Sequence, residues 1–199
     1  MKLPEVYGLL ISWVVISFCF SVSYLINYPA FFYIAFMLST ASAGLGFILH
    51  ELAHRNTAKR YGCYAYYQVW WWGIVLALAV AILTQGQFIF AALGAVYISP
   101  MVASTMLDSD AIKRAFGIIS LAGPSMNLLL AAAFYVLSYA GGLFEVLAII
   151  GIQINLWLAA FNLIPIPPFD GSKIFNWSKL VWVIFAIPAW LLTLFLPLI

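Results

Sequence analysis

The stretch ILHELAHR, residues 48–55, closes a long apolar run and decides how the rest of the chain is interpreted. Histidines four positions apart lie on one face of a helix, so His50 and His54 can reach a single metal ion. Glu51 is one position round from His50 and can act as a base on a water at that ion without filling a ligand position. The chain has two histidines in all, and both lie in this stretch. The alternative is an ordinary polar helix end, marked by Arg55.

The composition of the chain is that of a membrane protein. Of its 199 residues, 66% are hydrophobic and 7% are charged, whereas soluble domains carry roughly 25% charged residues. Such a chain has too few charged groups to cover a water-facing surface. We therefore expect a multi-pass protein of the cell membrane with a single domain over residues 1–199. Its net charge of +2 is no sign of nucleic acid binding, so the expected surroundings are the lipid bilayer.

The apolar segments predict the architecture. They cover residues 7–26, 30–48, 69–84, 88–99, 115–140, 144–164 and 180–199. All but the fourth are long enough to span the bilayer as helices, which predicts an all-α fold with about six transmembrane helices. The exception, at residues 87–99, is short and contains Gly94 and β-branched residues, so we expect a strand or a re-entrant piece there.

The positions of lysine and arginine predict the orientation, because these residues favour the cytoplasmic side. If residues 69–99 cross the membrane an even number of times, every lysine and arginine lies in the cytoplasm. We therefore predict a hydrophobic hairpin between Tyr66 and Ser99, built from a helix and a returning segment or fully re-entrant. His50 precedes Arg55 by five residues, about 7.5 Å of helix rise. The metal site should lie just below the cytoplasmic face.

A catalytic zinc ion needs a third protein ligand and an open position for water. Asp170 is the best candidate, since it follows several prolines that end a helix and lies three residues from the cytoplasmic Lys173. It should be at the depth of the histidines on irregular backbone. Asp170-Gly171 could alternatively be an ordinary turn. The other residues with ligating side chains are less suitable, because of the side of the membrane or the depth at which they lie, or because no motif supports them: Glu5, Cys19, Cys63, Asp108, Asp110 and Glu145.

Three elements of the chain together resemble the site-2 protease family of intramembrane zinc metalloproteases. They are HELAH at residues 50–54, GPSMN at residues 123–127 and NLIPIPPFDG at residues 162–171. They occur in the family's order and span most of the chain. The second and third are similar to the family's GPxxN element and to its asparagine–proline–aspartate–glycine element.

The resemblance implies a function and roles for individual residues. It implies that His50, His54 and Asp170 bind one zinc ion and that Glu51 is the base. Asn127 would lie near the active site and help to hold the substrate or the oxyanion, although it could instead be an amide that bridges packed helices. The substrates would be membrane-spanning helices of other proteins, often cut to release a cytoplasmic regulator.

The sequence departs from many members of that family, and it leaves other functions open. It carries no PDZ-like insertion and no regulatory domain, and residues 66–99 are unusually apolar where relatives often place a membrane-associated sheet. A membrane metal-ion transporter would use the same three ligands as a transit site. A catalytically silent scaffold is a third interpretation, but a structural zinc site would not need Glu51. Nothing in the sequence indicates an oligomeric state.

Overall fold

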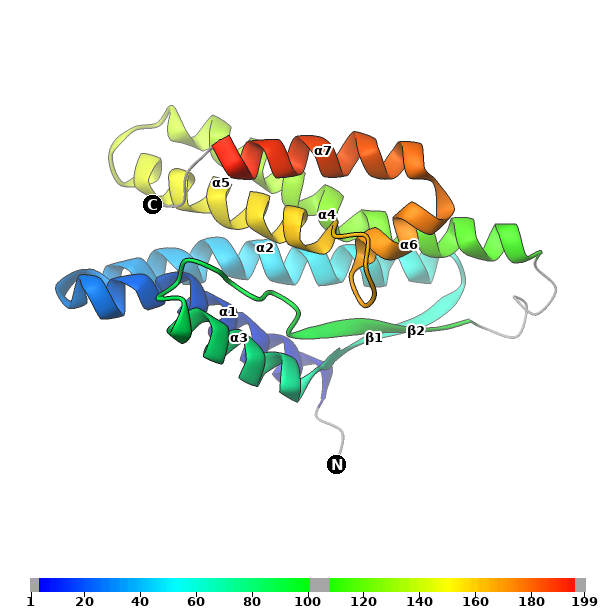
Figure 1. Cartoon of the computed structure of the whole chain (residues 1–199), viewed down its shortest axis with the longest axis horizontal. Helices are drawn as coiled ribbons and strands as arrows, with labels where there is room; N and C mark the ends of the chain where they lie inside the picture. The colour runs from blue at the N-terminus through cyan, green and yellow to red at the C-terminus, as the bar shows by residue number, and fades with distance from the viewer. Residues whose placement is uncertain (1–3, 101–107, 196–199) are drawn as a thin grey trace.

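The computed structural model describes residues 4–100 and 108–195, in which a long central helix lies between two groups of elements (Figure 1). The central helix, α2, covers Phe32–Arg60 and follows a short 3-10 turn, η1, at Pro29–Phe31. The remaining elements are α1 (Glu5–Asn27), β1 (Cys63–Val69), α3 (Trp71–Leu83), β2 (Gly94–Pro100), α4 (Ser109–Ser138), α5 (Gly142–Asn162), α6 (Asp170–Trp177) and α7 (Lys179–Phe195). In Figure 1, α1, α3 and the strands lie on one side of α2, and α4 to α7 lie on the other.

The predicted count of six spanning helices is wrong for the described part of the chain. Four helical stretches there are long and apolar enough to cross a membrane: Glu5–Asn27, Pro29–Arg60, Ser109–Ser138 and Gly142–Asn162. Helix α3 has 13 residues and rises about 20 Å, less than the hydrocarbon thickness of about 30 Å. Helix α7 has 17 described residues, and the last four of the predicted segment 180–199 lie outside the described residues. Hydropathy alone cannot distinguish an apolar segment that crosses from one that enters and returns.

Residues 63–100 form the predicted hairpin, with a helix going in and a returning segment. Strands β1 and β2 pair antiparallel from Val69–Gly94 to Cys63–Pro100. Between them, α3 ends in a turn where Gln85 and Gly86 have positive φ. Of the strand or re-entrant piece expected at residues 87–99, the structure shows a strand, β2, over the second half of that range. Its partner β1 was not predicted, so the chain forms a two-stranded sheet here despite the apolar sequence.

The returning segment packs closely against its neighbours. A Cβ at Gly73 of α3 would overlap the carbonyl oxygen of Ala92, so glycine allows the two backbones to touch. On the other side, the Trp157 side chain of α5 donates a hydrogen bond of 2.9 Å to the carbonyl of Ile89. The first contact joins the returning segment to α3 and the second joins it to α5, and β2 lies beside α2.

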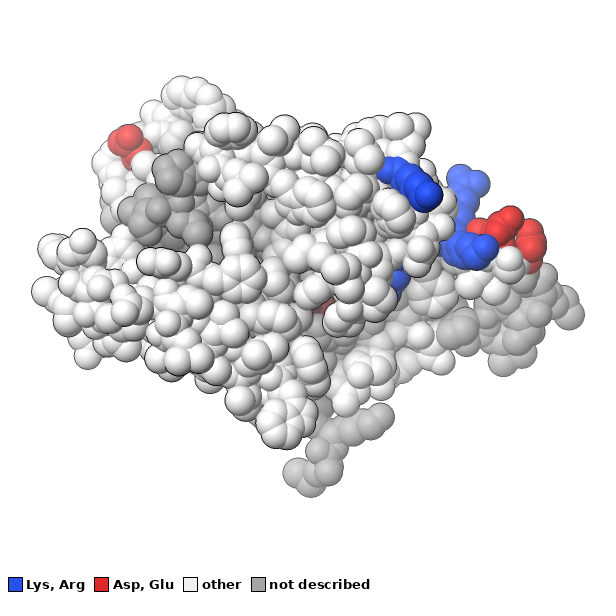
Figure 2. Space-filling view, viewed as in Figure 1, with Lys and Arg blue, Asp and Glu red and all other residues white. Residues whose placement is uncertain are grey.

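The distribution of side chains is the reverse of that in a soluble protein. Tyr33 and Leu83 are exposed, whereas Ser12, Ser17 and Ser21 are fully buried in α1. Small and polar residues at helix contacts with apolar residues outside are typical of membrane bundles. The space-filling view shows a face nearly free of charge, with the basic side chains gathered at one end (Figure 2). At that end α2 finishes with Lys59 and Arg60, and α4, α6 and α7 begin (Figure 1).

Candidate metal centre

Helix α2 presents His50 and His54 on one face, one turn apart. Their rings lie edge to face with centroids 4.6 Å apart, and both residues are buried. The Nε2 atoms are 2.9 Å from each other. Two ring nitrogens at this distance need a proton or a cation between them, because their lone pairs repel.

The Nδ1 atoms of both rings are engaged by helix α4. His50 Nδ1 lies 2.6 Å from Oδ1 of Asn127, and His54 Nδ1 lies 2.8 Å from the backbone carbonyl of Ile119. A carbonyl only accepts, so the Nδ1 of His54 donates, and the neutral form of the ring then has its lone pair on Nε2 for a metal ion. Metal-binding histidines are oriented in this way by a partner on the other nitrogen.

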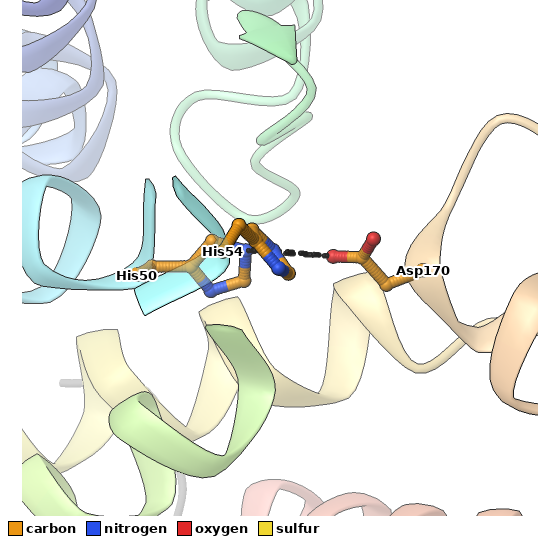
Figure 3. A group of neighbouring side chains, drawn as sticks. All are labelled: His50, His54 and Asp170. Atoms are coloured by element: carbon orange, nitrogen blue, oxygen red, sulfur yellow. Dashed lines mark hydrogen bonds and ion pairs between the residues drawn. The ribbon is translucent and has the colours of Figure 1, made fainter. Parts of the chain in front are cut away.

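Asp170 completes the cluster from the other side of the fold (Figure 3). Its Oδ2 lies 2.9 Å from Nε2 of His54 and 3.6 Å from Nε2 of His50. The expectation of irregular backbone was wrong, because Asp170 is the first residue of α6. The glycine after it serves close packing, since a Cβ at Gly171 would overlap the carbonyl of Leu163. Gly171 thereby lets α6 start against the end of α5, with the carboxylate facing α2.

The three ligand atoms fit a zinc ion. Their separations of 2.9, 2.9 and 3.6 Å lie around the roughly 3.3 Å expected between ligands of a tetrahedral ion with bonds of about 2.0–2.1 Å. Two imidazoles and one carboxylate are also a common ligand set of catalytic zinc, which leaves the fourth position open. Among the described residues, His50, His54 and Asp170 form a group that could hold a metal ion.

The carboxyl of Asp170 is in the charge state that a cation requires. Burial by itself would raise the pKa of Asp170, but the charge of His54, hydrogen bonds from His50 and His54 and the charge of Lys173 together hold that pKa well below its usual range. Lys173 reaches Oδ1 at 3.6 Å. The second oxygen is thus engaged from α6, and Oδ2 is left to face the histidines.

The element at residues 123–127 has a steric role that the sequence did not reveal. A Cβ at Gly123 would overlap Nε2 of His54 and lie 2.6 Å from Nε2 of His50. Only glycine therefore allows α4 to pass this close to the imidazoles. Pro124 follows inside the helix, where it cannot donate to the carbonyl of Ser120 and its ring crowds that carbonyl. The neighbouring carbonyl of Ile119 receives His54.

Gly123→Ala is expected to weaken zinc binding about 10- to 100-fold, the range found when groups around a metal ligand set are changed. The new methyl group must displace one or both imidazoles or push α4 away from α2. Zinc content and competition with a chelator would measure the change. Gly44→Ala is the matched control, because its Cβ would overlap the side chain of Trp13 in α1 and not the histidines. Equal zinc affinity for the Gly123 variant and the wild type would contradict the steric argument.

Glu51 opens onto the same cavity as the ligands. A cavity of about 290 Å³ is bordered by the ligands, Glu51 and strand β2. Glu51 is buried, and its Oε2 has no hydrogen-bond partner among the described residues. A buried carboxylate oxygen without a partner is costly unless a ligand or water meets it. It is therefore placed to act on a molecule in this cavity.

Asn127 is buried between helices and is not among the residues that line this cavity. Its side chain contacts His50, the carbonyl of Gly46 and the side chain of Asn155. This geometry matches the bridging amide better than a group that touches substrate. Sequence reasoning missed Asn155 altogether, because a lone asparagine in an apolar helix carries no recognisable pattern.

Other residues weighed as ligands have different surroundings. Cys19 is buried in the apolar core of α1. Glu5 accepts hydrogen bonds from the side chain of Arg55 and from the backbone of Tyr67, at 3.0 and 3.2 Å. Glu5 therefore ties α1 to the end of α2 and to strand β1, and it is not one of the three residues of the ligand cluster.

Comparison with known proteins identifies one curated relative. A protein of Methanocaldococcus jannaschii named "Putative zinc metalloprotease MJ0611" is 37% identical to this chain over 187 residues, which cover 92% of this chain and 90% of that protein. No protein-family model matches the chain, and no solved structure matches it significantly. The similarity thus covers nearly the whole of both chains.

Proposed function

The chain belongs to the zinc metalloprotease family of its Methanocaldococcus jannaschii relative, and on this premise we propose that it is an intramembrane protease of the site-2 type. It hydrolyses peptide bonds within or near the membrane-spanning helices of other proteins, as in regulated intramembrane proteolysis. The observation that carries the proposal is the meeting of His50, His54 and Asp170 beside Glu51, on a helix long enough to span a membrane.

The residues divide the chemistry between them. His50, His54 and Asp170 hold one zinc ion per chain. Bound zinc lowers the pKa of a water ligand and polarises the carbonyl of the scissile bond. Glu51 accepts the proton of the attacking water and passes it to the leaving amine. Its free Oε2 on the shared cavity supports this role.

The substrate must change its conformation before it is cut. A membrane-spanning helix engages its carbonyl groups in internal hydrogen bonds, so the segment at the scissile bond has to unwind. Outside protein, free backbone groups are very costly in the hydrocarbon region. The cavity between α2 and β2 gives the unwound segment polar surroundings at the zinc ligands.

The orientation follows from the charges. The basic ends of α2, α4, α6 and α7 lie together (Figure 1), and such an end favours the cytoplasm. The active site then lies near the cytoplasmic face of the cell membrane. We expect reporters fused after Tyr61 and at Asp110 to be cytoplasmic and one at Glu145 to be on the far side, as measured by reporter activity in cells. Reporters at Tyr61 and Asp110 on opposite sides would contradict both the orientation and the hairpin.

A transporter explains the site less well. A transit site needs metal ligands on a path through both faces, whereas the ligand cluster of the described residues lies toward the charged end. A scaffold with structural zinc does not need a carboxylate with an unpaired oxygen beside the ligands. Both alternatives leave Glu51 without a role.

The decisive experiment combines zinc analysis of the purified protein with cleavage of a model membrane-spanning peptide in the same preparation. The wild type is compared with Glu51→Gln. Zinc uptake into proteoliposomes without peptide cleavage would indicate the transporter instead.

A further inference from the structure

The side chain of Asn127 joins two helices to the metal centre. Its Nδ2 lies 3.0 Å from the carbonyl of Gly46 on α2 and 3.0 Å from Oδ1 of Asn155 on α5. Its Oδ1 lies 2.6 Å from Nδ1 of His50. Asn127 and Asn155 are both completely buried, so the loss of any of these bonds would leave a buried polar group unpaired.

The direction of this chain of hydrogen bonds is set by backbone carbonyls. The carbonyl of Gly46 can only accept, so the NH₂ group of Asn127 must face it. The oxygen of Asn127 then faces His50 and accepts the proton of Nδ1. A neutral imidazole with its proton on Nδ1 has its lone pair on Nε2, which is the atom that faces Asp170.

Asn155 is oriented by the same rule. Its Nδ2 donates 2.8 Å to the carbonyl of Gly151 in its own helix, so its Oδ1 points outward. That oxygen receives the second N–H of Asn127. Each amide is therefore held with its oxygen toward the next group, and this series of hydrogen bonds ends at His50.

We propose that Asn155 is a positioning residue of the metal centre. It holds the Asn127 amide in the orientation that makes His50 bind the metal through Nε2. The inference rests on the metal site of the proposed function and does not depend on which peptide bond the enzyme cleaves. It also assigns Asn127 a role through His50 rather than on the substrate.

The packing of α2 against α5 is adapted to this arrangement. A Cβ at Gly46 would lie 2.7 Å from Oδ1 of Asn155. Glycine at this position thus gives the Asn155 amide its space, while its carbonyl orients Asn127. The two histidines differ in this respect, because His54 is held by the backbone carbonyl of Ile119 and needs no side-chain relay.

The test uses the purified full chain labelled with ¹⁵N-histidine. Because the chain has two histidines, NMR reports the protonated nitrogen of each ring separately. In Asn155→Leu, we expect His50 to lose its fixed Nδ1–H signal while His54 keeps the wild-type signal. Zinc affinity, measured by competition with a chelator, should fall about ten-fold, as for other groups that orient metal ligands. In an Asn127→Leu background, the additional change Asn155→Leu should cause no further loss of zinc affinity.

Ser17→Ala is the control for lost polar packing. Ser17 is fully buried and donates 2.8 Å to the carbonyl of Trp13 in its own helix, without contact to the metal centre. It should leave both histidine signals and the zinc affinity unchanged. If Asn155→Leu behaves like this control, or if its effect simply adds to that of Asn127→Leu, Asn155 is structural and the inference is overturned.

A second variant tests the relay if Asn155→Leu does not fold. Gly46→Ala displaces the Asn155 amide from the α2 side and should give the same change at His50 alone. An unchanged His50 signal in a folded Gly46→Ala protein would overturn the inference. A wild type that binds no zinc would count against the proposed function instead, because the His50 signal is measured with or without the metal.

Discussion

Replacing Glu51 with glutamine should leave zinc bound and lower the rate of peptide cleavage at least 100-fold. General acid–base groups typically contribute about 10²–10⁴ in rate. The amide of glutamine has the shape of the carboxylate but cannot take up the proton of the attacking water. Zinc remains because its three ligands, Nε2 of His50, Nε2 of His54 and Oδ2 of Asp170, are unchanged.

Zinc stoichiometry and cleavage of the model peptide are measured on the same sample. Glu145→Gln is the matched control, because Glu145 is exposed in the first turn of α5. The ligand Asp170 follows the opposite end of that helix, at the start of α6. This control should retain zinc and full activity. Wild-type cleavage by the Glu51 variant would rule out its assignment as the base and with it the mechanism proposed above.

His54→Ala should abolish zinc binding and peptide cleavage at once. The substitution removes one of three ligands and the 2.9 Å contact with Asp170, and it leaves the Ile119 carbonyl without its donor. Loss of a ligand should exceed the 10- to 100-fold effect of changing a group that only orients one, so zinc should be absent after purification. Cleavage should fall to background.

Misfolding has to be separated from loss of the metal in this variant. Wild-type protein stripped with a chelator is the suitable reference, because it lacks zinc but keeps every side chain. The two samples should have similar helical content by circular dichroism, and added zinc should restore cleavage to the stripped wild type alone. Stoichiometric zinc in His54→Ala would mean that another residue completes the site and would contradict the assigned ligand set.

The two variants together distinguish binding from catalysis. Glu51→Gln separates the base from the metal site, whereas His54→Ala removes the site itself. A transit site for metal ions predicts that Glu51→Gln keeps its full function, because metal transport would not require a proton acceptor. The pair thus tests the proposed reaction and not only the presence of zinc.

Much of the architecture could be predicted because it depends on composition and charge. The low charge content predicts a membrane protein, and the basic residues predict that residues 66–99 return to the side from which they came. The pairing of β1 with β2 brings the two ends of this segment together, as that return requires. The number of spans could not be predicted in the same way. Whether α3 crosses or turns back depends on its contacts with the returning segment, such as that between Gly73 and Ala92.

The amino-acid sequence by itself determined the part of the site that is local. His50, Glu51 and His54 share one helix, and helical periodicity alone places two imidazoles on one face with a carboxylate beside them. Tertiary structure decided the rest, because the remaining groups come from three other elements: Asp170 from α6, Gly123 and Asn127 from α4, and Asn155 from α5. Their positions result from helix packing over separations of tens of residues, which no local spacing encodes.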